Sequence, residues 1–172
     1  MKSPGLSDFL LCRGQQYFLG LNIPFPWLPF LKFDFTGIPI VLSLLLYGLP
    51  HGATTSIVAF LAILVRSGDF VGSSMKGLAE FFTILGMVVG LRWLGKFRRA
   101  TSFVIGIIFR CISMSIANLI AIPTYYGMSL AATLSILPLI VVFNAMQGCL
   151  SILVGYSIYE ALRRRVPSLT KP

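Results

Sequence analysis

Long apolar stretches make up most of the chain, and short breaks that contain proline, glycine or charged residues separate them. A helix needs about 20 apolar residues to cross a hydrocarbon layer of roughly 30 Å, and it satisfies its own backbone hydrogen bonds in lipid. The second and third stretches are short for full spans, so we expect them to tilt or to cross only partly. The pattern predicts an all-α integral membrane protein, a single transmembrane domain over residues 1–172, with six transmembrane helices at about 5–22, 38–49, 52–66, 76–95, 101–123 and 128–162.

The composition supports this prediction and excludes an ordinary soluble domain. Of 172 residues, 56% are hydrophobic and 11% are charged, and the mean hydropathy is +0.88. Polar residues interrupt the first apolar stretch, so we expect no cleaved signal peptide and a mature chain that starts near Met1. The cysteines lie far apart inside apolar segments, without the spacing of metal ligands, and we interpret them as packing residues: Cys12, Cys111 and Cys149.

The net charge is +9, and six of the 14 lysine and arginine residues lie in two basic clusters next to the expected helices. They are Lys-Phe-Arg-Arg at 96–99 and Arg-Arg-Arg at 163–165. Such clusters mark the cytoplasmic side of a membrane protein, so we interpret the charge as topological and expect no nucleic-acid partner. With six spans, both termini are then cytoplasmic, and the breaks at 24–37, 66–75 and 123–127 face outward.

Polar side chains inside the expected helices are candidates for function, because burying them in lipid is costly. Arg110 could extend toward the cytoplasmic interface, so we favour a structural role for it. Asn144 and Gln147 are three residues apart and share a helix face. Together with Asn118 they offer neutral hydrogen-bonding groups that suit a neutral ligand with amide, imide or hydroxyl functions. The same residues could equally hold helices together by hydrogen bonds.

The sequence contains no pattern that predicts catalysis. It lacks a Gly-x-Ser-x-Gly elbow, a His-Glu-x-x-His pair, an aspartate-rich metal site and a phosphate-binding P-loop. His51, in the break at 48–52, is the only histidine. We therefore expect a protein that is not an enzyme and has no metal and no cofactor, and any active transport would need energy from a partner or an ion gradient.

Four stretches resemble the riboflavin-specific S components, the substrate-binding membrane subunits of energy-coupling-factor (ECF) vitamin transporters. Residues 23–42 are similar to the first outer loop and second helix of that family, where the pattern commonly runs Pro-x-x-Leu-x-x-Asp-Phe-Ser-Asp-x-Pro. Lys-Gly-Leu-Ala-Glu-Phe-Phe at 76–82 resembles its Gly-x-x-Ala-Asn-Phe-Leu segment. Residues 117–128 resemble the end of its fifth helix, Asn-x-x-x-x-x-Pro-x-Tyr-Gly-Met. Val-Phe-Asn-Ala-Met-Gln-Gly at 142–148 resembles Pro-Phe-Asn-x-x-Lys-Gly in the sixth.

The resemblance implies a multi-pass protein of the cell membrane that binds riboflavin as its transported ligand at the outer side. Its partners would be a transmembrane T component and two cytoplasmic ATPase subunits, so ATP hydrolysis would occur in the partners. By position, Asn118 and Asn144 match asparagines that hydrogen-bond the ligand, and Gln147 occupies the place of a ligand-contacting lysine. Loop positions near the pocket are matched by Phe30, Leu31 and Lys32.

The charged and aromatic segment at 29–39 is then expected to be a lid over the pocket, with Lys32 as a candidate ligand contact. Asp34 could pair with Lys32 or fix the loop by accepting backbone hydrogen bonds. We expect Asp34, Glu80 and Tyr125 to support the pocket or loop.

Three positions depart from the family pattern: Gln147 replaces a lysine, Glu80 an asparagine and Gly37 an aspartate. The first segment also lacks the smooth apolar helix with small residues by which the family meets its T component. The three substitutions are compatible with a different vitamin or with a rearranged flavin site. Two alternatives to riboflavin stay open: an S component for another small vitamin or precursor and, in a different class, a ligand-free membrane scaffold or assembly protein.

Overall fold

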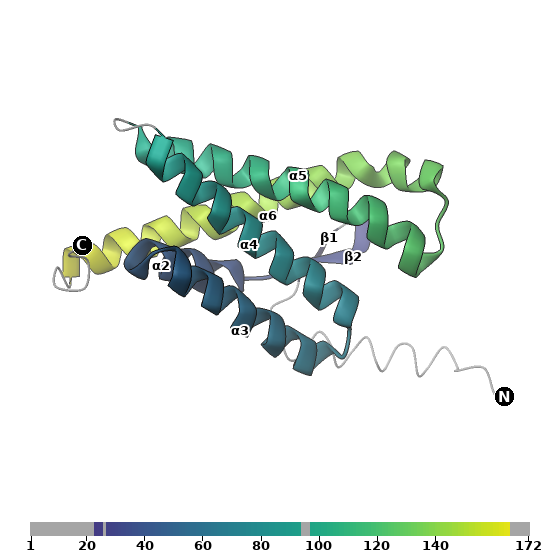
Figure 1. Ribbon diagram of the computed structural model, residues 1–172, viewed down its shortest axis with the longest axis horizontal. Coiled ribbons are helices and arrows are strands. Elements are labelled where there is room, and N and C mark those ends of the chain that lie inside the picture. Colours follow the sequence, from purple (N-terminus) through teal and green to yellow (C-terminus); the bar gives the residue numbers. More distant parts are fainter. Residues whose placement is uncertain (1–22, 26, 94–96, 166–172) are drawn as a thin grey trace. The chain divides into compact units, whose positions relative to one another are not determined.

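The computed structural model describes residues 23–25, 27–93 and 97–165 (Figure 1). The first expected helix, at 5–22, lies outside these residues. The chain forms two compact units, one up to Phe35 and one from Thr36 on, and each is described by itself. The described elements are β1 (Ile23–Phe25), β2 (Leu28–Phe33), α2 (Gly37–Tyr47), α3 (Leu49–Ser67), α4 (Phe70–Trp93), α5 (Arg98–Tyr126) and α6 (Leu130–Arg165).

The first unit contains an antiparallel hairpin of β1 and β2. Ile23 pairs with Phe33 and Pro24 with Lys32, and the register is irregular between Pro24 and Phe25. The expectation of an all-α chain with a loop at 24–37 is therefore wrong for this segment. Its aromatic and branched aliphatic residues favour strands, and proline is tolerated where no ladder N–H is needed.

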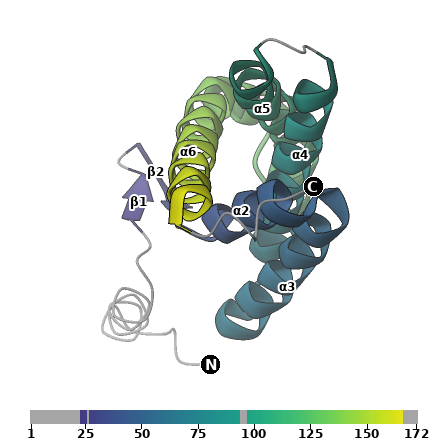
Figure 2. The ribbon, with the colours of Figure 1, turned by 90° about the vertical axis from the view of Figure 1, so that its left-hand side faces the viewer.

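The second unit is a ring of helices. In order around the ring, α2 packs against α3, α3 against α4, α4 against α5, α5 against α6, and α6 returns to α2 (Figure 2). In the described part of the chain, four helices, α3 to α6, are long and apolar enough to cross a membrane. The prediction of a mainly helical, multi-pass membrane protein is confirmed, whereas a sixth helix and the cytoplasmic placement of both termini stay predictions.

Local signals set where the helices begin and end. Gly48, with φ of 90°, separates α2 from α3, and Gly68, with φ of 66°, ends α3 in the left-handed region that glycine adopts easily. Asp69 Oδ1 accepts a hydrogen bond from the Gly72 backbone N–H at 3.0 Å, as an N-cap does. Because of this cap, α4 begins at Phe70, earlier than the expected segment. At the other end, α5 continues through Pro123 before Gly127, with φ of 65°, ends it.

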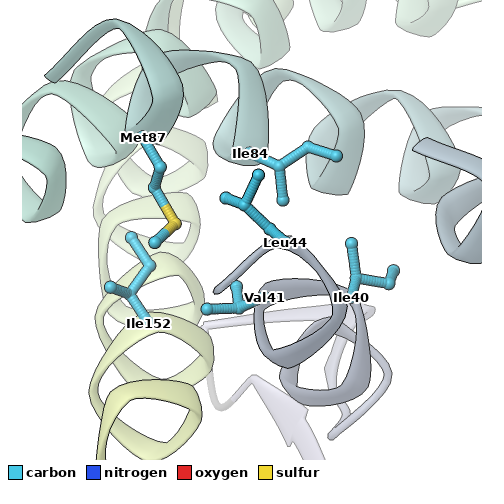
Figure 3. Close-up of a cluster of buried hydrophobic side chains, with 6 residues drawn as sticks. All are labelled: Ile40, Val41, Leu44, Ile84, Met87 and Ile152. Carbon is cyan, nitrogen blue, oxygen red and sulfur yellow. The ribbon is translucent and has the colours of Figure 1, made fainter. Parts of the chain in front are cut away.

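The helix α2 has 11 residues, about 16 Å, so it crosses only part of a bilayer. Its first residue lies beside Ser151, near the middle of α6, and Val41 lies beside Gly155. The helix therefore starts inside the bundle and runs parallel to the second half of α6. The apolar core fills the space between α2, α4 and α6 (Figure 3), and its side chains are those of Ile40, Val41, Leu44, Ile84, Met87 and Ile152.

Glycines let α4 and α5 approach closely. A Cβ added at Gly86 would lie 2.7 Å from the Ile105 carbonyl oxygen, and one at Gly90 would lie 2.5 Å from Ser102 Cα. Lipid tails are as apolar as the side chains, so helix association in a membrane depends on packing rather than on the hydrophobic effect. The Gly-x-x-x-Gly spacing of 86 and 90 therefore positions α5 against α4.

This packing generates a prediction for Gly86→Val. The new side chain meets backbone as well as Phe109 Cβ, so we expect the free energy of unfolding to fall by about 1–3 kcal/mol. Thermal unfolding in detergent, followed by size-exclusion chromatography, measures the loss. Ala131→Val, at an exposed position of α6, is the control and should leave the melting temperature unchanged. Equal melting temperatures for the two variants would contradict close α4–α5 packing.

Candidate functional site

The polar side chains inside the helices face the interior of the ring. On α5 the buried positions recur every fourth residue, which is the spacing of one helix face: Ser102, Gly106, Arg110, Met114 and Asn118. On α6 the buried face includes Asn144, Gln147 and Ser151. The carboxamides that the sequence singles out are therefore directed away from lipid.

Asn118 and Asn144 are bound to their own helices in the same way. The Asn118 Nδ2 group donates to the Met114 carbonyl oxygen at 2.7 Å, and the Asn144 Nδ2 group donates to the Ile140 carbonyl oxygen at 2.9 Å. Among the described residues, no group donates to either Oδ1 atom. A carboxamide has two N–H donors and an acceptor oxygen, so each side chain is held in place while an acceptor and a donor remain for a ligand.

The register of α5 and α6 places these two side chains on neighbouring turns. The helices are antiparallel: the Ser102 and Tyr156 hydroxyls hydrogen-bond at 2.6 Å, and a Cβ at Gly148 would lie 3.2 Å from Arg110 Cδ. Continued along the helices, this register sets Asn144 opposite Met114, so Asn118 lies one turn beyond it, about 6 Å along the axis. The pair can therefore contact one ligand from two helices.

Glu80 and Arg110 form a buried ion pair in the middle of the bundle. Arg110 Nη1 donates to Glu80 Oε1 at 2.9 Å and to Thr83 Oγ1 at 3.0 Å, and the two charged side chains are only 2% and 1% exposed. The interpretation that Arg110 extends to the interface is wrong, because a carboxylate on α4 neutralises it within the bundle. An acidic and a basic residue inside two expected helices were the sequence signal for this pair.

Gly37, Glu80 and Ser151 meet where α2 begins. A Cβ at Gly37 would overlap the Ser151 hydroxyl and come within 2.5 Å of Glu80 Oε2. The positive end of the α2 dipole therefore lies beside the carboxylate. An aspartate at residue 37, as in the family pattern, would collide with Glu80 and repel it, so Gly37 and Glu80 are matched to each other. Sequence reasoning did not find this contact or the roles of Thr83 and Ser151.

The Gln147 side chain is fully buried, and it lies one turn along α6 from Asn144, next to Gly148. Gly148 is the residue that packs against Arg110. The positive charge that the family pattern has at residue 147 is thus absent from α6 but present on the adjacent helix, where Glu80 balances it. Of the three departures from the pattern, Gly37 and Glu80 lie side by side, and Gln147 precedes the residue that packs against Arg110.

The other predicted site residues lie elsewhere. Phe30, Leu31 and Lys32 are in β2, and Asp34, the residue after β2 in the sequence, is buried. They belong to the hairpin unit, so their contact with a ligand on α5 and α6 stays a prediction. Tyr125 is exposed near the end of α5. Among the described residues, no three histidine, cysteine or acidic side chains are grouped to hold a metal ion.

The ion pair generates a prediction about stability. Glu80→Gln leaves the Arg110 guanidinium buried without its counter-charge, so we expect it to cost about 3–5 kcal/mol of unfolding free energy. Glu80→Gln combined with Arg110→Met removes both charges and should cost clearly less than Glu80→Gln alone. Thermal unfolding in detergent compares them.

Glu160→Gln is the matched control, because it breaks the half-exposed Arg99–Glu160 pair and should cost less than about 1 kcal/mol. A Glu80→Gln loss as small as that of Glu160→Gln would show that the central pair does not stabilise the bundle.

No family model and no curated protein matches the chain. Among solved structures, the S component of a bacterial ECF transporter is similar, with a TM-score of 0.73 and 24% sequence identity over 92% of this chain and 94% of the other. At this identity the likeness shows the fold: the chain folds like an ECF S component.

Proposed function

We propose that this protein is a riboflavin-binding S component of the cell membrane, which takes up the vitamin together with a T component and two ATPase subunits. The observation that carries the proposal is the pair of buried asparagines on facing helices, Asn118 and Asn144, inside a bundle with the fold of an S component. Energy would come from ATP hydrolysis in the partner subunits.

The chemistry of riboflavin fits the two asparagines. The isoalloxazine ring has an imide edge with two carbonyl acceptors and an N–H donor between them. A carboxamide can donate to such an acceptor through its N–H groups and accept from such a donor through its oxygen. Its flat faces are apolar, and Met114 and Phe143 are buried apolar side chains next to the asparagine turns. The ribityl hydroxyls would extend from the ring toward other polar groups. A ligand of this shape would use both hydrogen-bonding and apolar parts of the interior.

The electrical balance of the helical unit also favours a neutral ligand. Its buried charged side chains, among the described residues, are Glu80 and Arg110, and they neutralise each other. A charged ligand in such an interior would lack a counter-charge and would lose its hydration without compensation. Riboflavin carries no net charge, which supports it over charged vitamins.

The hairpin would act as the lid in this proposal. Trp27 is exposed at its turn, and Leu31 and Lys32 are half-buried in β2. An aromatic and aliphatic hairpin can cover a flat ring, and two strands restrict its backbone more than an irregular loop does. Lys32 is the candidate ligand contact in this segment.

The direct test is to purify the protein in detergent, record its visible absorption and titrate riboflavin while following flavin fluorescence. We expect a yellow preparation or quenching on addition. A colourless protein that leaves the fluorescence unchanged would refute riboflavin binding. Mass spectrometry of molecules released on denaturation would then identify another vitamin, and the absence of any released molecule would favour the scaffold alternative.

Asn144→Ala tests the assigned site. Leaving a ligand donor or acceptor unpaired costs about 1–3 kcal/mol, so the dissociation constant for riboflavin should rise roughly 5- to 150-fold. Ser135→Ala is the control, because Ser135 also hydrogen-bonds the carbonyl four residues earlier in α6 but is exposed. An Asn144→Ala protein with unchanged affinity would assign Asn144 to holding the helices together instead.

A further inference from the structure

Five exposed arginines gather at the end of the bundle where α5 begins and α6 ends: Arg98, Arg99, Arg163, Arg164 and Arg165. The Arg99–Glu160 contact of 3.1 Å joins the two helices at this end. Among the described residues here, Glu160 is the acidic one, and its other oxygen lies 4.0 Å from Arg164 Nε. No carboxylate of the described chain lies within ion-pair distance of Arg98, Arg163 or Arg165. This end therefore has a large surplus of positive charge.

An open groove of about 590 Å³ follows α6 up to this cluster. Its lining residues recur at the spacing of one helix face, and they are Leu153, Tyr156, Ser157, Glu160, Ala161, Arg164 and Arg165. From first to last they cover about 18 Å of helix. The lining changes from aliphatic and aromatic at Leu153 and Tyr156 to cationic at Arg164 and Arg165.

This gradient matches the depth profile of a membrane leaflet. The apolar part of α6 belongs in hydrocarbon, and the arginines at its end belong at the level of the headgroups. The Tyr156 hydroxyl is held by Ser102 of α5 at 2.6 Å, which fixes this wall of the groove. Guanidinium groups bind phosphate oxygens in a planar, bidentate manner. A molecule with an acyl chain and an anionic phosphate head would satisfy both ends of the groove.

We propose that this groove binds an anionic phospholipid, with the headgroup on Arg164 and Arg165 and an acyl chain along Leu153 and Ala161. The surplus of arginines favours a lipid with net negative charge over a zwitterionic one. Glu160 weakens the site, because it neutralises part of the arginine charge and repels the headgroup. Arg164 lies 20 residues beyond Asn144 on α6, about 30 Å along the helix, so the headgroup end of the site does not depend on which ligand the asparagine pair binds.

The test uses the full chain in detergent, titrated with dioleoylphosphatidylglycerol or dioleoylphosphatidylcholine, with bound lipids counted by native mass spectrometry. The wild-type protein should bind the anionic lipid at lower concentration than the zwitterionic one. Each basic residue near an anionic surface contributes roughly fivefold in affinity. We therefore expect Arg165→Gln to weaken phosphatidylglycerol binding about fivefold, and Arg164→Gln with Arg165→Gln to weaken it by more than about tenfold.

Two further variants make the test specific. Arg66→Gln removes an exposed arginine from the last turn of α3 and should leave the affinity unchanged. Glu160→Gln should strengthen phosphatidylglycerol binding, because it releases Arg99 and Arg164. Equal affinity of the wild-type protein for both lipids would overturn the proposal. Equal losses from Arg66→Gln and Arg165→Gln, or weaker binding by Glu160→Gln, would also overturn it.

Discussion

The buried ion pair between Glu80 and Arg110 is the interaction on which the interior of this bundle depends. Two charges in a bilayer interior are tolerated only when each satisfies the other, and here the two side chains are almost completely enclosed. The pair joins α4 to α5, Thr83 receives a further hydrogen bond from the guanidinium, and the start of α2 lies against the carboxylate. The fourth helix is α6, whose Gly148 packs against the aliphatic part of the Arg110 side chain. The ion pair is therefore in contact with α2, α4, α5 and α6.

The pair also makes sense of the positions where the chain departs from the S component pattern. Gly37 leaves room for Glu80, and Gln147 needs no charge of its own because Arg110 lies beside the next residue on α6. Among the described residues of the helical unit, the buried charges of Glu80 and Arg110 cancel. In the proposed function, the carboxamides of Asn118 and Asn144 then select the ligand by hydrogen bonding. In that function, Glu80 and Arg110 hold the bundle together, and Asn118 and Asn144 bind riboflavin.

The packing between α4 and α5 differs between the two ends of the bundle. Between α4 and α5, glycines and a serine bring the backbones together near the arginine-rich end, where Gly90 meets Ser102. Toward the other end, the buried face of α5 carries Met114 and Asn118, and then Ala121 and Ile122. Close backbone contact stabilises one half by dispersion. In the other half, no group of the described residues donates to the Oδ1 atoms of Asn118 and Asn144.

The sequence by itself determined the membrane setting, the mainly helical fold and the shared face of Asn144 and Gln147, because apolar length and helical spacing are local properties. It did not reveal the hairpin, since short strands leave little periodicity to detect, nor the early start of α4, which depends on the cap by Asp69. The Glu80–Arg110 pair, the fit of Gly37 and the approach of Asn118 to Asn144 join residues that are distant in the chain. Only the tertiary structure decided them, because the register between packed helices depends on how side chains from separate helices fit together.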